Sequence, residues 1–462
     1  MCPLAIHQIT TRGVPIVFAF AFAPLVGCSK PAVQFDQNWS PPVKVSESID
    51  GFVGGVDLYR WQNTIMALQG LDDGSAKCFM FNRSGGNDAW AEVPLTGVPR
   101  GYIWARPAMD QASDKTFFQD GYMENDELVM KVLIGRLTGS LAVRDVKEEK
   151  WLTDRKTLFG DARPNERLNK PGKRNWPSLG LGLVNGEDLY IPYRINGETF
   201  NENTVFLSKG PFNNGAFHST DSGMTWQLEQ ISDFAAWLPS MCKTKLYYYY
   251  FAVKNYQRDL WFSRKPVGGS SWEGPKVVTD TFCDSALHWQ YVAAASGDTV
   301  HLCWLDRRHE KRRADPVDAN RENYEVMYCQ RKDADADWGK DIILSKGLLY
   351  SYRPCMSVEG DKIVVAWSGV QTAGDGHVEN GPNDIYYVTS KDSGKTWAKP
   401  LKITDRANDG IASGEPRVLL FNGVIHLFYI QGKRESQQLS PGLTKLNQPP
   451  WPIYYTQRPF PD

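Results

Sequence analysis

The sequence lacks three features that would each point to a familiar class of protein. Its 52 basic and 53 acidic residues leave a formal net charge of −1, so nothing favours a nucleic acid as partner. It contains no Cys-x-x-Cys pair and no cluster among its 7 histidines, so it offers no recognisable metal site. Its N-terminal apolar run, residues 14–25, has only 12 residues, whereas a membrane-spanning helix needs roughly 20. We expect no nucleic-acid partner, no metal and no other cofactor.

The short apolar run at the N-terminus has the length of a signal-peptide core. It follows Arg12 and ends in Leu25-Val26-Gly27-Cys28, which resembles the bacterial lipobox. That resemblance implies that Cys28 becomes the lipidated first residue of the mature chain, on the periplasmic or the outer side of a membrane. An ordinary secretory signal cut nearby is the alternative, and either way we expect export. The predicted division is a signal peptide at 1–28, a tether at 29–38 and one folded domain at 39–462.

One phrase of eight residues occurs twice in the chain. Residues 219–226 and 390–397 both fit the pattern S-x-D-x-G-x-T-W. Asp before Gly suits a tight turn, because the carboxylate accepts nearby backbone N–H groups and Gly takes a positive φ without a clash. The Thr-Trp that follows restarts a strand and supplies a large ring to pack between layers. The repeated phrase predicts a repeated supersecondary unit.

Weaker copies of the phrase extend the repeat over the whole mature chain. The tryptophans that mark the copies are Trp39, Trp90, Trp151, Trp226, Trp272, Trp338 and Trp397. One unit is clear between residues 354 and 403, with strands A to D expected at 354–358, 362–367, 385–390 and 400–403. These are short antiparallel strands separated by turn signals.

A four-stranded antiparallel unit repeated about seven times predicts an all-β fold, a β-propeller of seven blades, with six as the alternative. Residues 452–456 look like a C strand without a D partner, and residues 39–45 look like a D strand without the rest of a blade. Pairing of these two ends would close the ring and remove two exposed edges. A solenoid is the competing architecture. We expect a monomer.

Six cysteines remain after Cys28. Export permits disulfides, and Cys303 and Cys329 are the best candidate pair because they lie on strands expected to be hairpin neighbours. The alternative is that all six are small buried strand residues.

The repeated phrase resembles the Asp-box, or BNR repeat, of the sialidase superfamily. The resemblance covers essentially the whole mature chain and implies a propeller whose boxes lie on C–D turns, away from the active face. The B–C and D–A loops then share the opposite, upper face. The longest B–C connections are 196–204, 307–323, 369–383 and 431–451, and such length on one face favours a binding surface there.

Residues at the starts of A strands and the ends of B strands surround the upper mouth of such a propeller. The candidates are Arg106, Trp176, Trp237, His288, Tyr352, Arg353, Glu415 and Arg417 from A strands, and Arg194, Asp306 and Arg307 from B strands. A guanidinium holds a carboxylate bidentately, and aromatic rings stack on sugar faces. An ionised Glu beside a Tyr activates that Tyr as a nucleophile.

The resemblance implies roles for these residues. Sialidases carry an Arg-Ile-Pro element whose Arg belongs to a triad that grips the sialic-acid carboxylate; Arg106-Pro107 and Arg353-Pro354 partly resemble it, without the Ile. Arg194, Arg307 or Arg417 would be the third donor. The alternative reading is that the Pro only marks the start of a strand. Tyr352 and Tyr429 compete for the nucleophile, with Glu415 a candidate partner.

Several aspartates are candidates for the catalytic acid. Asp50, Asp57 and Asp120 compete for the acid/base position that sialidases have in an early blade, and Asp306 is a further catalytic candidate. Seven-bladed relatives include rhamnosidase-like hydrolases and uronate polysaccharide lyases that use His and Tyr, a chemistry that His288 and Tyr291 could supply. The alternative for His288 is a simple structural hydrogen bond.

The leading expectation is a sialidase-like exo-glycosidase acting on acidic or complex glycans, bound to a membrane only through its lipid. The alternatives are a non-catalytic propeller that binds glycan or protein, and a uronate lyase or rhamnosidase-like hydrolase on the same scaffold.

Overall fold

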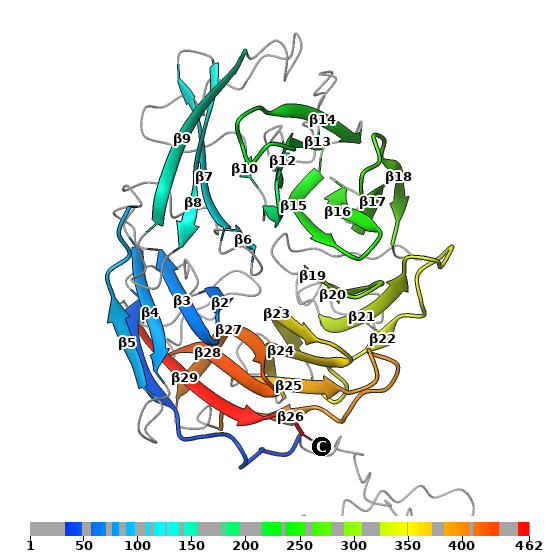
Figure 1. Cartoon of the computed structure of the whole chain (residues 1–462). Helices are drawn as coiled ribbons and strands as arrows, with labels where there is room; N and C mark the ends of the chain where they lie inside the picture. Colours follow the sequence, from blue (N-terminus) through cyan, green and yellow to red (C-terminus); the bar gives the residue numbers. More distant parts are fainter. Residues whose placement is uncertain are drawn as a thin grey trace, which may run out of the picture. The chain divides into compact units, whose positions relative to one another are not determined.

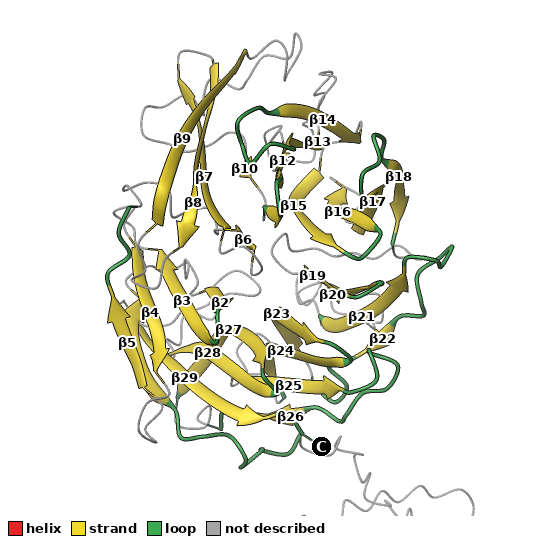
Figure 2. Cartoon of the chain, in the orientation of Figure 1, coloured by secondary structure: helices red, strands yellow, loops and turns green. Residues whose placement is uncertain are grey.

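The computed structural model shows strands and no helix in the part of the chain that it describes (Figure 2). The described residues are 33–48, 57–70, 76–82, 89–97, 108–110, 115–124, 127–137, 143–154, 178–179, 182–194, 214–232, 236–254, 260–278, 291–306, 324–348, 350–371, 383–405, 410–433 and 451–461. Within these ranges, no helix has the length and hydropathy needed to cross a membrane.

The strands form seven antiparallel sheets, six with four strands and one with five. Sheet 1 contains β2 (Asp57–Trp61), β3 (Thr64–Gly70), β4 (Ala76–Asn82) and β5 (Ala89–Val93). Sheet 2 contains β6 (Ala108–Asp110), β7 (Lys115–Glu124), β8 (Glu127–Leu137) and β9 (Val143–Asp154). Sheet 3 contains β10 (Ser178–Leu179), β11 (Leu183–Asn185), β12 (Asp188–Arg194), β13 (Asn214–Ser219) and β14 (Gln227–Ser232). Sheet 4 contains β15 (Ala236–Lys243), β16 (Tyr247–Lys254), β17 (Leu260–Pro266) and β18 (Glu273–Val277).

The remaining three sheets are formed by the later strands of the chain, with β1 added to the last of them (Figure 1). Sheet 5 contains β19 (Tyr291–Ser296), β20 (Thr299–Asp306), β21 (Glu325–Lys332) and β22 (Ile342–Ile343). Sheet 6 contains β23 (Tyr350–Glu359), β24 (Lys362–Val370), β25 (Asn383–Ser390) and β26 (Leu401–Lys402). Sheet 7 contains β27 (Ile411–Phe421), β28 (Val424–Lys433), β29 (Trp451–Pro459) and the N-terminal strand β1 (Val43–Ser48). The predicted all-β class and four-stranded antiparallel unit are confirmed.

First strands of neighbouring sheets lie against one another. β27 contacts both β2 and β23, β23 contacts β19, and β19 contacts β15. At the other end, β15 contacts β12, and β11 contacts β6. From sheet 4 through sheets 5, 6 and 7 to sheet 1, each sheet therefore presents its first strand to its neighbour's first strand.

Tight turns join the first two strands of the sheets, as predicted. In sheet 6, Glu359 pairs with Lys362 and Gly360 has φ 61°. In sheet 7, Asn422 and Gly423 have φ of 51° and 70°, the sign that a type I′ hairpin turn requires at both positions. Asn and Gly are the residues that adopt this conformation at least cost.

The two copies of the repeated phrase have the same geometry on the turn after the third strand. In sheet 6, Gly394 N donates to Ser390 Oγ at 2.9 Å, and Asp392 accepts from Thr396 N at 2.9 Å and from Thr396 Oγ1 at 2.6 Å. Burial alone would raise the pKa of Asp392, but the Thr396 bonds outweigh it and lower that pKa to about 2. In sheet 3, Asp221 and Thr225 form the same two bonds at 2.8 and 2.6 Å. The turn thus satisfies its own backbone through an ionised Asp.

The tryptophan that follows this turn packs on the preceding sheet. Trp397 meets Tyr328 edge to face, with ring centroids 4.7 Å apart and planes at 70°. Edge-to-face contacts of the same kind join Trp90 to Tyr455, Trp338 to Phe262, and Trp39 to Tyr387. Such pairs add about 0.5–1.5 kcal/mol beyond the area they bury. Trp39, Trp90, Trp338 and Trp397 therefore occupy equivalent positions, as their spacing predicts.

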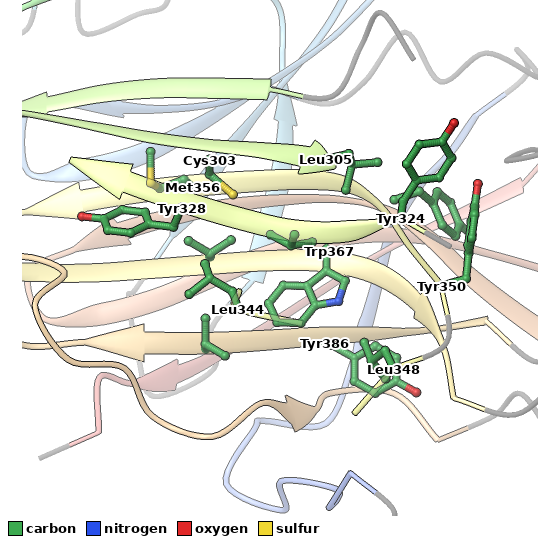
Figure 3. Packing of buried hydrophobic residues seen from close by; sticks show 14 of the residues in the cluster. Cys303, Leu305, Tyr324, Tyr328, Leu344, Leu348, Tyr350, Met356, Trp367 and Tyr386 are labelled. Atoms are coloured by element: carbon green, nitrogen blue, oxygen red, sulfur yellow. The ribbon is translucent and has the colours of Figure 1, made fainter. Parts of the chain in front are cut away.

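The core between sheets 5 and 6 shows what holds neighbouring sheets together (Figure 3). Cys303, Leu305 and Tyr328 of sheet 5 form one buried cluster with Met356 and Trp367 of sheet 6. Burying a large apolar side chain stabilises the fold by about 1.5–3 kcal/mol. The sheets are therefore joined chiefly by apolar side chains.

The two ends of the described chain meet in sheet 7. β1 pairs antiparallel with β29, with Val43 opposite Tyr455 and Ser48 opposite Trp451. The D strand expected at 39–45 begins only at Val43, after Pro41 and Pro42, which have no N–H to donate to a ladder.

The described half of the predicted tether lies against the sheets. Phe35 forms a β-bridge with Lys402. Asp36 is 5% exposed and accepts hydrogen bonds from Tyr387 of sheet 6 and Arg458 of sheet 7. Burial alone would raise the pKa of Asp36, but bonds from Tyr387 and Asn38 and the charge of Arg458 lower it instead. Residues 33–38 are thus bound, and only 29–32 remain as a predicted tether.

The predicted Cys303–Cys329 disulfide is wrong. The two cysteines are not joined by a disulfide, and both are buried. Cys329 lies opposite Leu302, so Cys303 is one position out of register and its side chain points to the other face of the sheet. Accordingly, Cys303 belongs to the core shared with sheet 6 and Cys329 to the core shared with sheet 4. Cys283 lies outside the described residues.

Candidate functional site

Three first strands carry a β-bulge at a proline. Residues 238–239 of β15, 353–354 of β23 and 415–416 of β27 each stand opposite a single residue of the next strand. The second residue of each bulge is Pro239, Pro354 or Pro416, which has no N–H and costs the ladder no hydrogen bond. The reading of Pro354 as the start of its strand is wrong, because β23 begins at Tyr350.

The bulges of sheets 6 and 7 hold their first residue in a strained conformation. Arg353 has φ 56° and Glu415 has φ 53°, in the left-handed region that side chains with a Cβ rarely adopt. Each such residue costs about 1–3 kcal/mol and persists only where its surroundings enforce it. The strain turns these two side chains toward each other.

Four charged residues form the Arg353–Glu415 cluster: Asp57, Arg353, Glu415 and Arg417. Arg353 Nε lies 2.8 Å from Glu415 Oε1, and Arg417 Nη1 lies 4.0 Å from Glu415 Oε2. Arg417 Nε lies 3.6 Å from Asp57 Oδ1. Arg417 Nε is buried and has no hydrogen-bond partner among the described residues. The cluster joins the first strands of sheets 1, 6 and 7, and its side chains are 15–20% exposed.

Two hydroxyl groups lie beside this cluster. A Cβ built on Gly414 would be 3.9 Å from Ser368 Oγ and 4.0 Å from Tyr352 Oη. Tyr352 is 7% exposed and Ser368 is fully buried. The structure therefore brings three of the predicted site residues, Arg353, Glu415 and Arg417, into one cluster, and it places the hydroxyl of a fourth, Tyr352, near Gly414, the residue before Glu415.

The structure does not bring Asp306 into this group. Asp306 is fully buried and accepts a hydrogen bond from Trp304 Nε1 at 3.1 Å. Trp304 belongs to the core shared with sheet 4, and a residue two positions further along a strand shares its face. Asp306 therefore points away from sheet 6. Of the three early acids, Asp57 lies in the cluster.

The other predicted site residues are not placed by the structure. Those that lie outside the described residues are Cys28, Arg106, Trp176, His288 and Arg307. Arg194 pairs with Ser178 in sheet 3 and Trp237 with Val253 in sheet 4, but their side chains lie outside the described part. The long connections 196–204 and 307–323 also lie outside it, as do most of 369–383 and 431–451.

A second set of polar residues, the Glu229–Lys265 cluster, joins sheets 3 and 4 and was missed from the sequence. Glu229 accepts from Lys265 Nζ at 2.7 and 2.8 Å and from Trp272 Nε1 at 2.8 Å, and His218 Nδ1 lies 2.7 Å away. Burial alone would raise the pKa of Glu229, but these partners outweigh it and lower the pKa to about 2. Lys265 is 2% exposed, whereas the Glu229 side chain is 17% exposed, so the cation of this cluster is buried and its carboxylate is partly open to solvent.

A buried His–Tyr–Gln unit also repeats. His301 Nδ1 lies 2.7 Å from Tyr328 Oη, which donates to Gln330. His426 stands in the same relation to Tyr455, which donates to Gln457. Burial lowers the pKa of His301 to about 4, so it is neutral at pH 7. In both sheets the His is the third residue of the second strand, and this recurrence in the sequence could have revealed the unit. The unit belongs to the packing between strands.

Within the described residues, no group of three or more His, Cys, Asp or Glu side chains is arranged to hold a metal ion. The chemistry of the Arg353–Glu415 cluster is therefore that of two guanidinium groups, two carboxylates and the neighbouring hydroxyls.

Comparisons with known proteins show only low similarity. No model of a known family matches the chain, and no curated protein matches it. Among solved structures it is similar to the polysaccharide lyase Uly1, at 10% identity and a TM-score of 0.41, over 88% of this chain and 90% of the lyase. It is similar to Trypanosoma rangeli sialidase at 10% identity and a TM-score of 0.40, over 90% of this chain and 55% of the sialidase.

A third similar structure is the β-propeller domain of the Trilobed protease from Pyrococcus furiosus, at 9% identity and a TM-score of 0.40, over 87% of this chain and 99% of that domain. The chain thus spans little more than half the length of the sialidase. These overlaps are loose, and no residue role is carried over from any of the three.

Proposed function

We propose that the protein is an exported, lipid-anchored, glycan-active β-propeller whose site is the Arg353–Glu415 cluster with Tyr352. Seven sheets in chain order, five of them joined through their first strands, with β1 completing the sheet of β27–β29, support a seven-bladed ring. The shared turn geometry of residues 219–226 and 390–397 supports reading them as Asp-boxes.

The arginines of the cluster support an acidic ligand. A guanidinium carries five N–H donors in a planar fork that matches a carboxylate. Arg353 and Arg417 share the carboxylate of Glu415, and the buried Nε of Arg417 has no hydrogen-bond partner among the described residues. The observation that carries the proposal is this pair of arginines, set side by side by two strained bulges on neighbouring sheets.

The first candidate reaction is sialidase-like exo-glycosidase chemistry. Tyr352 would attack the anomeric carbon, its proton passing to Glu415, while the glycosidic bond breaks and Asp57 protonates the departing oxygen. The hydroxyl of Tyr352 lies beside Gly414, the residue before Glu415, which supports this pairing. Asp57 is the early acid that contacts the cluster.

The second candidate is a non-catalytic propeller that binds acidic glycans. It is favoured by the engagement of Glu415 with two arginines, because a carboxylate whose oxygens already face two guanidinium groups has less room to accept the proton of a tyrosine. The two candidates share the ligand and differ only in turnover.

Binding of N-acetylneuraminate and turnover of a fluorogenic sialoside test both candidates. Replacing Arg353 with Ala removes a charge-assisted contact of roughly 1.5–3 kcal/mol, so binding should weaken about ten- to a hundredfold. Arg264→Ala is the matched control, because Arg264 Nε makes an equally short ion pair, 2.7 Å, with Glu273 in sheet 4. If the wild type neither binds nor turns over these probes, or if Arg353→Ala equals the control, the proposal is wrong.

Tyr352→Phe separates the two candidates. An exo-glycosidase should lose turnover of the sialoside outright, because the attacking hydroxyl is removed, while its affinity falls no more than about tenfold through one lost hydrogen bond. A binding protein should show no turnover in the wild type and the same modest fall in affinity.

The anchor has its own test. Acylation of Cys28, proposed from the lipobox-like sequence 25–28, would hold the protein on a membrane through its acyl chains. Metabolic labelling with a fatty-acid analogue should mark the wild type and not Cys28→Ala. Equal labelling of both would remove the lipid anchor from the proposal.

A further inference from the structure

We propose that Gly414, Ser368 and Tyr352 form a subsite for a hydroxyl group of the bound sugar, next to the carboxylate-binding arginines. This inference rests on the proposed function and adds a determinant of specificity to it. Two positions point to it: Gly414, which lacks a side chain where neighbouring sheets have one, and Ser368, a serine at an apolar position whose hydroxyl has no partner among the described residues.

The missing side chain is that of Gly414. The residue just before the bulge is Trp237 in sheet 4 and Tyr352 in sheet 6, where each pairs with the second strand at the same register as Gly414 does in sheet 7. Sheet 7 therefore has a glycine where the other two sheets have an aromatic ring. The described atoms nearest to a Cβ at Gly414 are the two hydroxyl oxygens, at 3.9 and 4.0 Å, so a methyl-sized space faces both.

The misplaced serine is Ser368. The second strand of sheet 6 is buried from Ile363 to Val370 and otherwise built of apolar residues and Gly369. The equivalent positions in sheets 5 and 7 are Leu305 and Ile430, both buried. Packing alone would place an apolar side chain at 368 as well, because a hydroxyl there must find a partner.

The hydroxyl of Ser368 is also an orphan. Its Oγ is buried and has no hydrogen-bond partner among the described residues. A buried polar group in that state costs free energy and calls for an explanation, and a bound molecule that supplies the partner is one such explanation. Ser368 Oγ and Tyr352 Oη converge on the space at Gly414, and each can both donate and accept a hydrogen bond. A hydroxyl is the ligand group that matches two such partners.

The closing experiment compares two acids that share a carboxylate on a six-membered ring. N-acetylneuraminate carries hydroxyls, whereas cyclohexanecarboxylate carries none. The wild type should bind the first more tightly. Ser368→Ala, which deletes the hydroxyl, and Gly414→Ala, which fills the space without a clash, should each reduce that preference about two- to tenfold and leave cyclohexanecarboxylate binding unchanged.

Ser351→Ala is the matched control. Ser351 is fully buried, and its Oγ has no hydrogen-bond partner among the described residues. It precedes Tyr352 and so points to the opposite face of β23, away from Gly414. Its replacement should leave both affinities unchanged. Thermal unfolding supplies a second readout, because removing an orphan hydroxyl should not lower the melting temperature of Ser368→Ala.

Each other outcome overturns a defined claim. If the wild type binds neither acid, the proposed function fails and the subsite with it. If the wild type binds both acids and Ser368→Ala and Gly414→Ala keep its preference, the subsite alone is wrong. A melting temperature several degrees lower for Ser368→Ala would show that the hydroxyl is a structural partner and would also reject the subsite.

Discussion

The Arg353–Glu415 cluster and the Glu229–Lys265 cluster both place opposite charges between neighbouring sheets, but they are built differently. Glu229 is held by Lys265, His218 and Trp272 on ordinary strand backbone, and Lys265 is 2% exposed. Glu415 is held at positive φ and meets one arginine closely and another at 4.0 Å. Both glutamate side chains are 17% exposed, but the two arginines at Glu415 are 15% and 20% exposed, whereas Lys265 is buried.

The difference separates a structural ion pair from a site. A carboxylate surrounded by short hydrogen bonds has its interactions completed by the fold itself and contributes to stability. A cluster with strained backbone and a buried donor that lacks a hydrogen-bond partner among the described residues is organised at a cost. Such a cost is expected where a ligand completes the interactions. The comparison therefore predicts that the same substitution changes the free energy of unfolding differently in the two clusters.

The largest expected difference follows from replacing each glutamate with Ala. Glu229→Ala leaves the charge of Lys265 buried without its partner and should lower the free energy of unfolding by about 3–5 kcal/mol. Glu415→Ala leaves two arginines that are 15% and 20% exposed and should cost about 1 kcal/mol or less. Urea unfolding of the two variants measures the difference, and adding Lys265→Met to Glu229→Ala should recover stability. Equal losses of unfolding free energy would show that the two clusters contribute equally to stability.

The same cluster gives the protein an acid limit. The pKa of Glu229 falls from 4.5 to about 2 on folding, so its contribution is complete above pH 4.5 and is lost as the pH falls toward 2. Between pH 5 and pH 3 the wild type should lose about 2 kcal/mol through this one group. Glu229→Gln, which cannot titrate, should lack that part of the loss while keeping the rest. Parallel pH profiles for the two proteins would contradict the assignment.

The sequence predicted those features that local chemistry dictates. The S-x-D-x-G-x-T-W phrase and the Asn-Gly and Glu-Gly-Asp turns determine their own backbone, so the sheets, the turns and the packing of Trp39 and Trp397 were predictable. Arg353, Glu415 and Arg417 were predictable as candidates because each lies beside a proline in a first strand. Their mutual contact depends on which strands are neighbours, and the order of the units along the chain supplies that.

The remaining features depend on register, which one sequence does not reveal. Cys303 and Cys329 differ by a single pairing position, and that position decides which core each enters. The prolines resembled strand starts because the bulges that accommodate them depend on the partner strand. The role of Gly414 becomes clear only from its alignment with Tyr352 and Trp237 in the other sheets. Asp36 looked like part of a tether because its partners, Tyr387 and Arg458, are more than 350 residues away in the sequence.

The smallest expected effect tests the strain directly. At Glu415, with φ 53°, Gly should be better tolerated than Ala by about 1 kcal/mol, because only Gly adopts the left-handed region without cost. At Glu229, which lies in β14 without positive φ, the order should reverse, since Gly weakens a strand by about 0.5–1 kcal/mol relative to Ala. Both pairs share the same loss of side chain, so each difference reports the backbone alone. Thermal or urea unfolding of Glu415→Gly, Glu415→Ala, Glu229→Gly and Glu229→Ala measures both differences. If Ala equals or exceeds Gly at both positions, Glu415 is not strained, and the contrast between a site assembled at a cost and a structural ion pair disappears.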